Sequence, residues 1–132
     1  MNEKNNIMRW KRLAEMDLAT AHHMFKTFHP IPLEIVCFHS QQAAEKMLKC
    51  YLISQKIEPP RTHDMQVLLE MCIDFENGFN DIYKEAATLT NYAVRLRYPA
   101  ELGLMEKDAV NAIESADKVM AFVKNFFKAF DI

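Results

Sequence analysis

The feature that most constrains the fold of this chain is its scarcity of glycine. Gly78 and Gly103 are the only two glycines among 132 residues, where an average chain of this length carries about nine, at ~7% of residues. All-β sandwiches need many tight turns, and Rossmann sheets need a glycine-rich phosphate loop. A P-loop, which ends in Gly-Lys followed by Ser or Thr, is also absent. So few turn residues indicate long helices.

Prolines and the two glycines divide the chain into five segments, and each segment has helical periodicity. Apolar residues recur at spacings of three and four over about residues 10–28, 33–56, 65–75, 79–96 and 109–130. This spacing places them on one face of each helix, as in helices that pack side by side. The sequence therefore predicts an all-α fold: a single up-and-down antiparallel bundle of about five helices, forming one domain over residues 1–132.

The fifth segment has a second apolar stripe, formed by Ala112, Val119 and Phe126, beside the main one that ends in Phe127 and Phe130. Two stripes offer more apolar surface than a single seam in a small bundle hides. We therefore expect this helix to be largely buried and to support self-association, most simply as a homodimer.

Charge and cysteine content exclude several classes of protein. A net charge of −2 excludes a uniformly basic nucleic-acid binder and leaves only a local basic patch. No uncharged run exceeds about ten residues, so neither a membrane span nor a secretory signal is expected. The three cysteines form no Cys-x-x-Cys pair and are expected to be buried free thiols in the cytoplasm. No metal-ligand spacing is present, so no metal or cofactor is expected.

One stripe of the second segment is polar at its centre. Its members recur at core-like spacings of four and three: Ile35, His39, Gln42, Lys46, Lys49 and Ile53. Unpaired polar groups are costly to bury dry. The stripe therefore either faces solvent or lines a cleft.

Two further clusters follow. The first is at the end of the fourth segment: Tyr92, Arg95, Arg97, Tyr98 and Pro99. Arginine there either complements the helix dipole or offers a planar fork beside a tyrosine ring, which suits phosphate and base stacking. The second cluster precedes the third segment, where Thr62 is a candidate helix N-cap. His63 is a helix-start residue for which a structural role is favoured over a place in a site.

Taken together, three stretches resemble the HEPN family of small helical, nucleotide-binding domains. They are residues 37–46 with Lys49, residues 61–64, and residues 89–92 running on to Arg97-Tyr98-Pro99. The resemblance covers roughly residues 8 to 128 and implies an antiparallel bundle, often a homodimer, encoded beside a minimal nucleotidyltransferase. Many such pairs behave as toxin and antitoxin, and the HEPN member is a metal-independent RNase.

The chain departs from the nuclease members of that family. Their pattern is an arginine, four to six intervening residues and a histidine, and no arginine here has a histidine at that interval. What remains is the family's Arg-Tyr-Pro variant.

We therefore expect a nucleotide- or RNA-binding module that works with a minimal nucleotidyltransferase in a toxin–antitoxin-like pair. Arg97 and Lys46 would meet phosphates, Tyr98 or Tyr92 would stack on a base, and His39 and Gln42 would form hydrogen bonds. No residue is assigned a catalytic role. Two alternatives stay open: a metal-independent RNase that uses His39 or His63 as acid and base, and a purely structural dimerisation domain.

Overall fold

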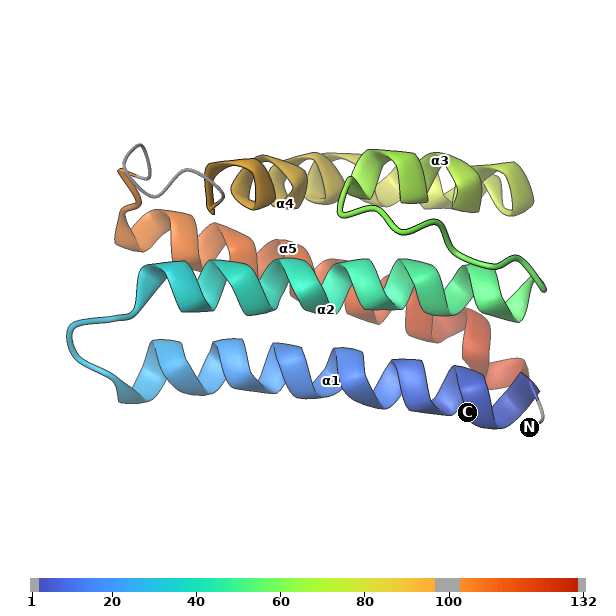
Figure 1. Ribbon diagram of the computed structural model, residues 1–132, viewed down its shortest axis with the longest axis horizontal. Coiled ribbons are helices and arrows are strands. Elements are labelled where there is room, and N and C mark those ends of the chain that lie inside the picture. Colours follow the sequence, from blue (N-terminus) through green and yellow to red (C-terminus); the bar gives the residue numbers. More distant parts are fainter. Residues whose placement is uncertain (1–2, 97–102, 131–132) are drawn as a thin grey trace.

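The computed structural model describes residues 3–96 and 103–130, and its regular structure is entirely helical there. The elements are α1 (Glu3–Thr27), α2 (Leu33–Ser54), α3 (Met65–Phe75), η1 (Asn77–Ile82), α4 (Tyr83–Leu96), α5 (Glu106–Lys124) and η3 (Asn125–Phe130). The helices lie side by side in one elongated bundle (Figure 1). The predicted all-α bundle of about five helices is confirmed, with no strand in the described ranges.

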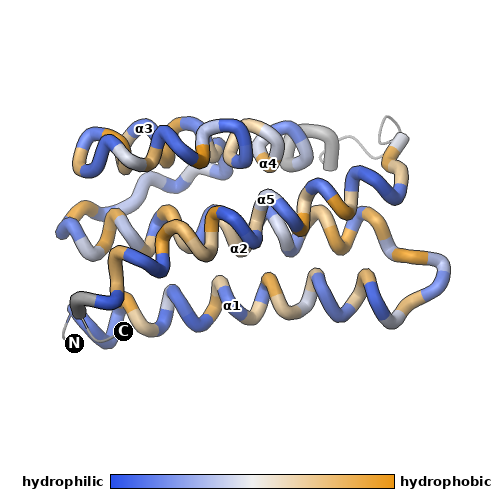
Figure 2. The backbone as a smooth tube through the Cα atoms, turned by 180° about the vertical axis from the view of Figure 1, so that it is seen from behind, coloured by the Kyte–Doolittle hydropathy of each residue, from blue (hydrophilic) through white to orange (hydrophobic). Residues whose placement is uncertain are grey.

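Helix α2 is the centre of the bundle and packs against each of the other four α-helices. Its Ala43 and Ala44 are fully buried, as is Met47. Small side chains at a helix contact let neighbouring axes approach closely, which suits a helix surrounded on several sides. The outer helix α1, by contrast, buries Ile7, Ala14 and Ala21 along one narrow face. Figure 2 shows the resulting mixture of apolar and polar residues along the helices.

The direction of the helices alternates except between α2 and α3. Met65 at the start of α3 lies against Gln41 of α2, and Cys72 one helical stretch later lies against Leu48. Residue numbers along these two helices therefore increase in the same direction, so α2 and α3 run parallel. The connection between them runs back between α2 and the α3 layer before α3 begins (Figure 1), and it brings His63 against Glu45 of α2.

Helix α3 spans the predicted residues, and its N-cap differs from the one expected. Its N-cap is Asp64, whose carboxylate accepts hydrogen bonds from the backbone N–H groups of Gln66 and Val67. Thr62 was the expected N-cap, and that expectation is wrong, because its hydroxyl instead accepts from the N–H of Asp64. An aspartate at the N-cap also places negative charge at the positive end of the helix dipole.

The fourth and fifth periodic segments are each divided into an α-helix and a 3-10 helix. Phe79 and Ile82 belong to η1, because Glu76 adopts an extended backbone and its carboxylate accepts the N–H of Gly78. Phe79 is fully buried, and its ring packs against those of Tyr51, Phe122 and Phe126 with centroid distances of 4.6, 5.0 and 5.3 Å.

Both apolar stripes of α5 are used inside the chain. Ala112 and Val119 are fully buried, and Phe126 belongs to the aromatic cluster around Phe79. Phe127 is 1% exposed. The expected burial of this helix is confirmed, and Ala112, Val119 and Phe126, the second stripe, pack within the chain.

Candidate functional site

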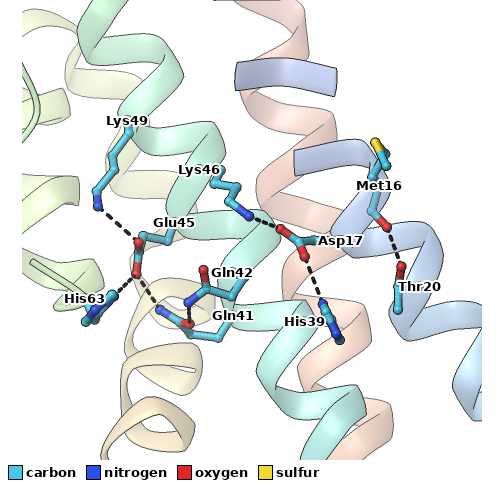
Figure 3. A network of polar contacts seen from close by, with 10 residues as sticks. All are labelled: Met16, Asp17, Thr20, His39, Gln41, Gln42, Glu45, Lys46, Lys49 and His63. Carbon is cyan, nitrogen blue, oxygen red and sulfur yellow. Dashed lines mark hydrogen bonds and ion pairs between the residues drawn. The ribbon is translucent and has the colours of Figure 1, made fainter. Parts of the chain in front are cut away.

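The polar stripe of α2 is half-buried between α1 on one side and the α2–α3 connection on the other (Figure 3). The side chains of His39, Lys46 and Lys49 are 28%, 25% and 11% exposed. The stripe is therefore more enclosed than an ordinary solvated face. It is not dry either, and each of these side chains has a specific polar partner.

Asp17 of α1 joins two members of the stripe. One carboxylate oxygen, Oδ1, lies 2.8 Å from Nδ1 of His39, and the other, Oδ2, accepts a hydrogen bond from Nζ of Lys46. The Asp17 side chain is only 13% exposed. Its charge is thus balanced at close range by Lys46, as a carboxylate at low exposure requires.

Glu45 organises the other half of the stripe. Its Oε2 accepts from Nζ of Lys49 at 3.0 Å, and its Oε1 lies 2.9 Å from both Nδ1 of His63 and the amide nitrogen of Gln41. The Glu45 side chain is 5% exposed. Gln42 completes the network by donating its amide to the Gln41 side-chain oxygen at 2.9 Å. Three of the expected site residues, His39, Gln42 and Lys46, therefore lie in one region.

Asp17 and Glu45 are the functional candidates that sequence reasoning missed. Asp17 falls three residues after Ala14 and four before Ala21, on the buried face of α1. A carboxylate on a buried face needs a cationic or hydrogen-bond-donor partner. The position of Asp17 on that face was therefore the sequence signal for a polar contact. For Glu45 the signal was its position four residues after Gln41 and four before Lys49, the spacing at which helical side chains meet.

These two carboxylates change the electrostatics expected of the stripe. Lys46 and Lys49 each face a carboxylate, so the two lysines add no net positive charge among the described residues. Attraction for an anion at the stripe then depends on cations outside it or on exchange of a lysine between its carboxylate and the ligand.

Both histidines of the site are oriented in the same way. His39 and His63 each use Nδ1 toward a carboxylate, and neither Nε2 has a hydrogen-bond partner among the described residues. A carboxylate that accepts from Nδ1–H holds the ring so that Nε2 is an acceptor in the neutral form and a donor in the charged form. The site thus presents two positioned imidazole nitrogens, and His63 is 57% exposed.

The remaining expected site residues are not gathered with this network in the described part of the chain. Tyr92 of α4 is 4% exposed, and its hydroxyl donates to Asp108 at 3.4 Å. Its ring is therefore packed inside and not presented for base stacking, while the hydroxyl edge lines a shallow hollow with Gln66 and Thr90. Arg97 and Tyr98 lie outside the described residues.

The cysteines and possible metal ligands are separate from the site. Cys37, Cys50 and Cys72 are buried free thiols, as expected. Burial raises the pKa of the Cys50 and Cys72 thiols to about 12. In the described ranges, no three His, Cys, Asp or Glu side chains are gathered as metal ligands would be. None of the described helices is both long and apolar enough to span a membrane.

Comparisons with known proteins bear on the whole chain. The model of the HEPN domain family matches residues 7–126. The structure of ST0689, an archaeal HEPN homologue, is 31% identical with a TM-score of 0.72, covering 90% of this chain and 95% of its own. TT1696 from Thermus thermophilus has a TM-score of 0.76 at 24% identity, covering 92% of this chain and 98% of its own, and supports the fold alone. No curated protein matches the chain. With the family model spanning nearly all of the bundle, the chain belongs to the HEPN domain family.

Proposed function

We propose that the chain is a nucleotide- or RNA-binding module whose ligand meets the polar stripe of α2. Family membership supports a nucleotide- or RNA-related role. The observation that carries the proposal is the pair of histidines, His39 and His63, each held by a low-exposure carboxylate with Nε2 left for a ligand. Side chains oriented in advance lose less freedom on binding, so they contribute more to affinity.

Within this proposal each residue has a chemical task. Nε2 of His39 and the amide of Gln42 form hydrogen bonds to ribose, base or phosphate. Lys46 contacts a phosphate by exchanging the Asp17 carboxylate for a phosphate oxygen. Arg97 supplies a bidentate phosphate contact and Tyr98 a stacking ring, as the family resemblance implies. For Tyr92 we retain a role for the hydroxyl alone, because the ring is buried.

Titration of a short fluorescent RNA tests this proposal. We expect His39→Ala and Arg97→Ala each to weaken binding about tenfold, the range for losing a charge-assisted hydrogen bond. Lys107→Ala is the matched control, since Lys107 is an exposed cation at the start of α5. Equal binding by all three variants would contradict the proposal.

A second candidate function is a metal-independent RNase. The observation in its favour is the same carboxylate–imidazole geometry, because a histidine whose Nδ1–H is held by a carboxylate is suited to proton transfer at Nε2. Cleavage of RNA in the presence of a chelator, lost in His39→Ala or His63→Ala, supports this function. Binding without any cleavage supports the binding module.

Partners and cellular setting complete the proposal. We propose that the domain works in the cytoplasm as a homodimer, with a minimal nucleotidyltransferase in a toxin–antitoxin-like pair, as the family resemblance implies. Sedimentation velocity and co-purification with the product of a neighbouring gene test these points. The alternative of a purely structural dimerisation domain has less support, because the stripes of α5 that suggested it are packed inside the chain.

A further inference from the structure

A cavity of about 570 Å³ lies beyond the Lys49 end of the α2 stripe. It has three walls: the first turns of α1, the last turns of α2, and the connection that follows α2. These segments lie together at one end of the bundle, although they are far apart in sequence (Figure 1). The volume falls within the ~300–1,000 Å³ of small-molecule sites.

One part of the cavity lining is aromatic and apolar. Trp10 is half-buried, packs against the core and lines the cavity, and Ile53 and Pro60 line it as well. Trp10 is the single tryptophan of the chain. A partly exposed indole beside aliphatic and proline side chains is a suitable surface for a flat ring, since nucleic-acid bases stack on aromatic side chains.

Another part of the lining is cationic. Lys49, Lys56 and Arg61 line the cavity, from the last turns of α2 and the connection after it. Lys49 is paired with Glu45, whereas no ion pair in the described part of the chain involves Lys56 or Arg61. Two cations without a carboxylate partner beside an apolar wall favour a ligand that joins a ring to an anionic group.

The backbone at Lys56 is an independent observation. Its φ is 64°, in the left-handed region. Its N–H donates to the Ile53 carbonyl at 2.9 Å, and the N–H of Ile57 donates to the Leu52 carbonyl at 3.0 Å. This is the helix C-terminal arrangement in which glycine is strongly preferred. The chain has lysine there, and a residue that opposes the local backbone preference at the rim of a cavity points to a use for its side chain.

Acidic and amide groups in the lining further restrict the class of ligand that the cavity fits. Glu3 and Asn6 stand on the same wall as Trp10, and Glu58 lines the cavity from the connection. Carboxylates repel a bare anion but accept hydrogen bonds from exocyclic amino groups and ribose hydroxyls. The lining is thus better matched to a nucleotide with an amino-bearing base than to a free phosphate.

We propose that this cavity is a second, separate binding site for a nucleotide with an amino-bearing purine base. The base stacks on Trp10, its amino group or ribose hydroxyls donate to Glu3 or Glu58, and its phosphate meets Lys56 and Arg61. The proposal does not rest on the function proposed for the α2 stripe, because none of these side chains belongs to that network.

The fluorescence of Trp10 reports on this site directly, since no other tryptophan contributes. Titration of the full chain with AMP is expected to quench Trp10 saturably and to release heat in calorimetry. Adenosine, which lacks the phosphate, and UMP, whose base lacks the amino group, are each expected to bind about tenfold more weakly. Inorganic phosphate is expected to leave Trp10 unchanged. No saturable signal with millimolar AMP, or equal binding of all four compounds, would overturn the proposal.

Two variants, with a control, test the roles of the cationic side chains. Arg61→Ala is expected to weaken AMP binding about tenfold, with Lys107→Ala unchanged as the exposed-cation control. Lys56→Gly is expected to raise the melting temperature, because glycine suits the positive φ, and to weaken AMP binding. A Lys56→Gly protein that is stabilised and binds AMP as well as the parent overturns the assigned role of Lys56. AMP binding is read from Trp10, whereas the stripe proposal is read from RNA titration of His39→Ala, so failure here and failure of the stripe proposal are distinguishable.

Discussion

At the scale of single residues, the bridge from Asp17 to His39 and Lys46 is the contact that most defines the candidate site. Asp17→Asn removes the charge and keeps the shape. We expect it to lower the free energy of unfolding by about 1–2 kcal/mol, since a half-buried Lys46 then lacks its counter-charge. The amide oxygen of the introduced asparagine can still accept from Nδ1–H of His39 and keep that ring oriented. We therefore also expect RNA affinity to rise, because Lys46 no longer has to leave a carboxylate.

Urea denaturation and RNA titration check both effects. Asp74→Asn is the control, as Asp74 is an exposed carboxylate on α3. If Asp17→Asn weakened RNA binding while the fold persisted, the charge of Asp17 would matter to the ligand through His39, and the exchange proposed for Lys46 would be wrong.

The buried thiols give a second prediction at this scale. Burial raises the pKa of Cys50 and Cys72 to about 12, and the thiolate is the form that reacts. At about pH 8 the native protein is therefore expected to resist alkylation by iodoacetamide at both positions, and the urea-unfolded protein to react at both. Mass spectrometry of the peptides distinguishes the sites. Rapid labelling of Cys50 in the native state would show that it is accessible.

At the scale of elements, the start of α3 has two neighbouring candidates for its N-cap, Asp64 and Thr62. Asp64 accepts the N–H groups of Gln66 and Val67, whereas Thr62 accepts only that of Asp64. We expect Asp64→Ala to reduce stability by about 1 kcal/mol, the usual cost of losing an N-cap. Thr62→Ala serves as the matched control and should cost only a few tenths. Thermal unfolding of both variants decides, and a larger loss for Thr62→Ala would reverse the assignment.

The helices also show how much of the fold can be predicted from the sequence. Periodicity identified all five α-helices, because apolar spacing of three and four depends only on local geometry. The predicted up-and-down order does not hold between α2 and α3, which run parallel, since direction depends on the path of residues 55–64. Periodicity also merged η1 with α4, because the spacing of Phe79, Ile82 and Ala86 is compatible with one continuous helix.

The candidate site was predicted in part for a related reason. His39, Gln42 and Lys46 share a face of one helix, so sequence spacing brings them together. Asp17 and His63 come from other elements, and their meeting with the stripe depends on the register between helices. Tyr92 was misjudged as a stacking ring, because its burial is set by packing against α5 and not by its place on α4.

At the scale of the whole molecule, α2 connects the two proposed sites. Its polar stripe lies beside α1 (Figure 3). The Trp10 cavity is lined by the last turns of α2 and the connection that follows it. Lys49 belongs to the first through Glu45 and lines the second. The central α2 is packed on several sides, so both sites are built on the most constrained helix of the fold.

The most direct test of the central claim is a nitrogen-15 spectrum of the histidine side chains during RNA titration. The account predicts that Nε2 of His39 shifts as RNA saturates the protein, because that nitrogen is held ready by Asp17. His22 is an internal control, since it is also bonded to a carboxylate, that of Asp117, but between α1 and α5. A shift of His39 with His22 unchanged supports binding at the α2 stripe. RNA binding that leaves His39 unchanged would contradict it.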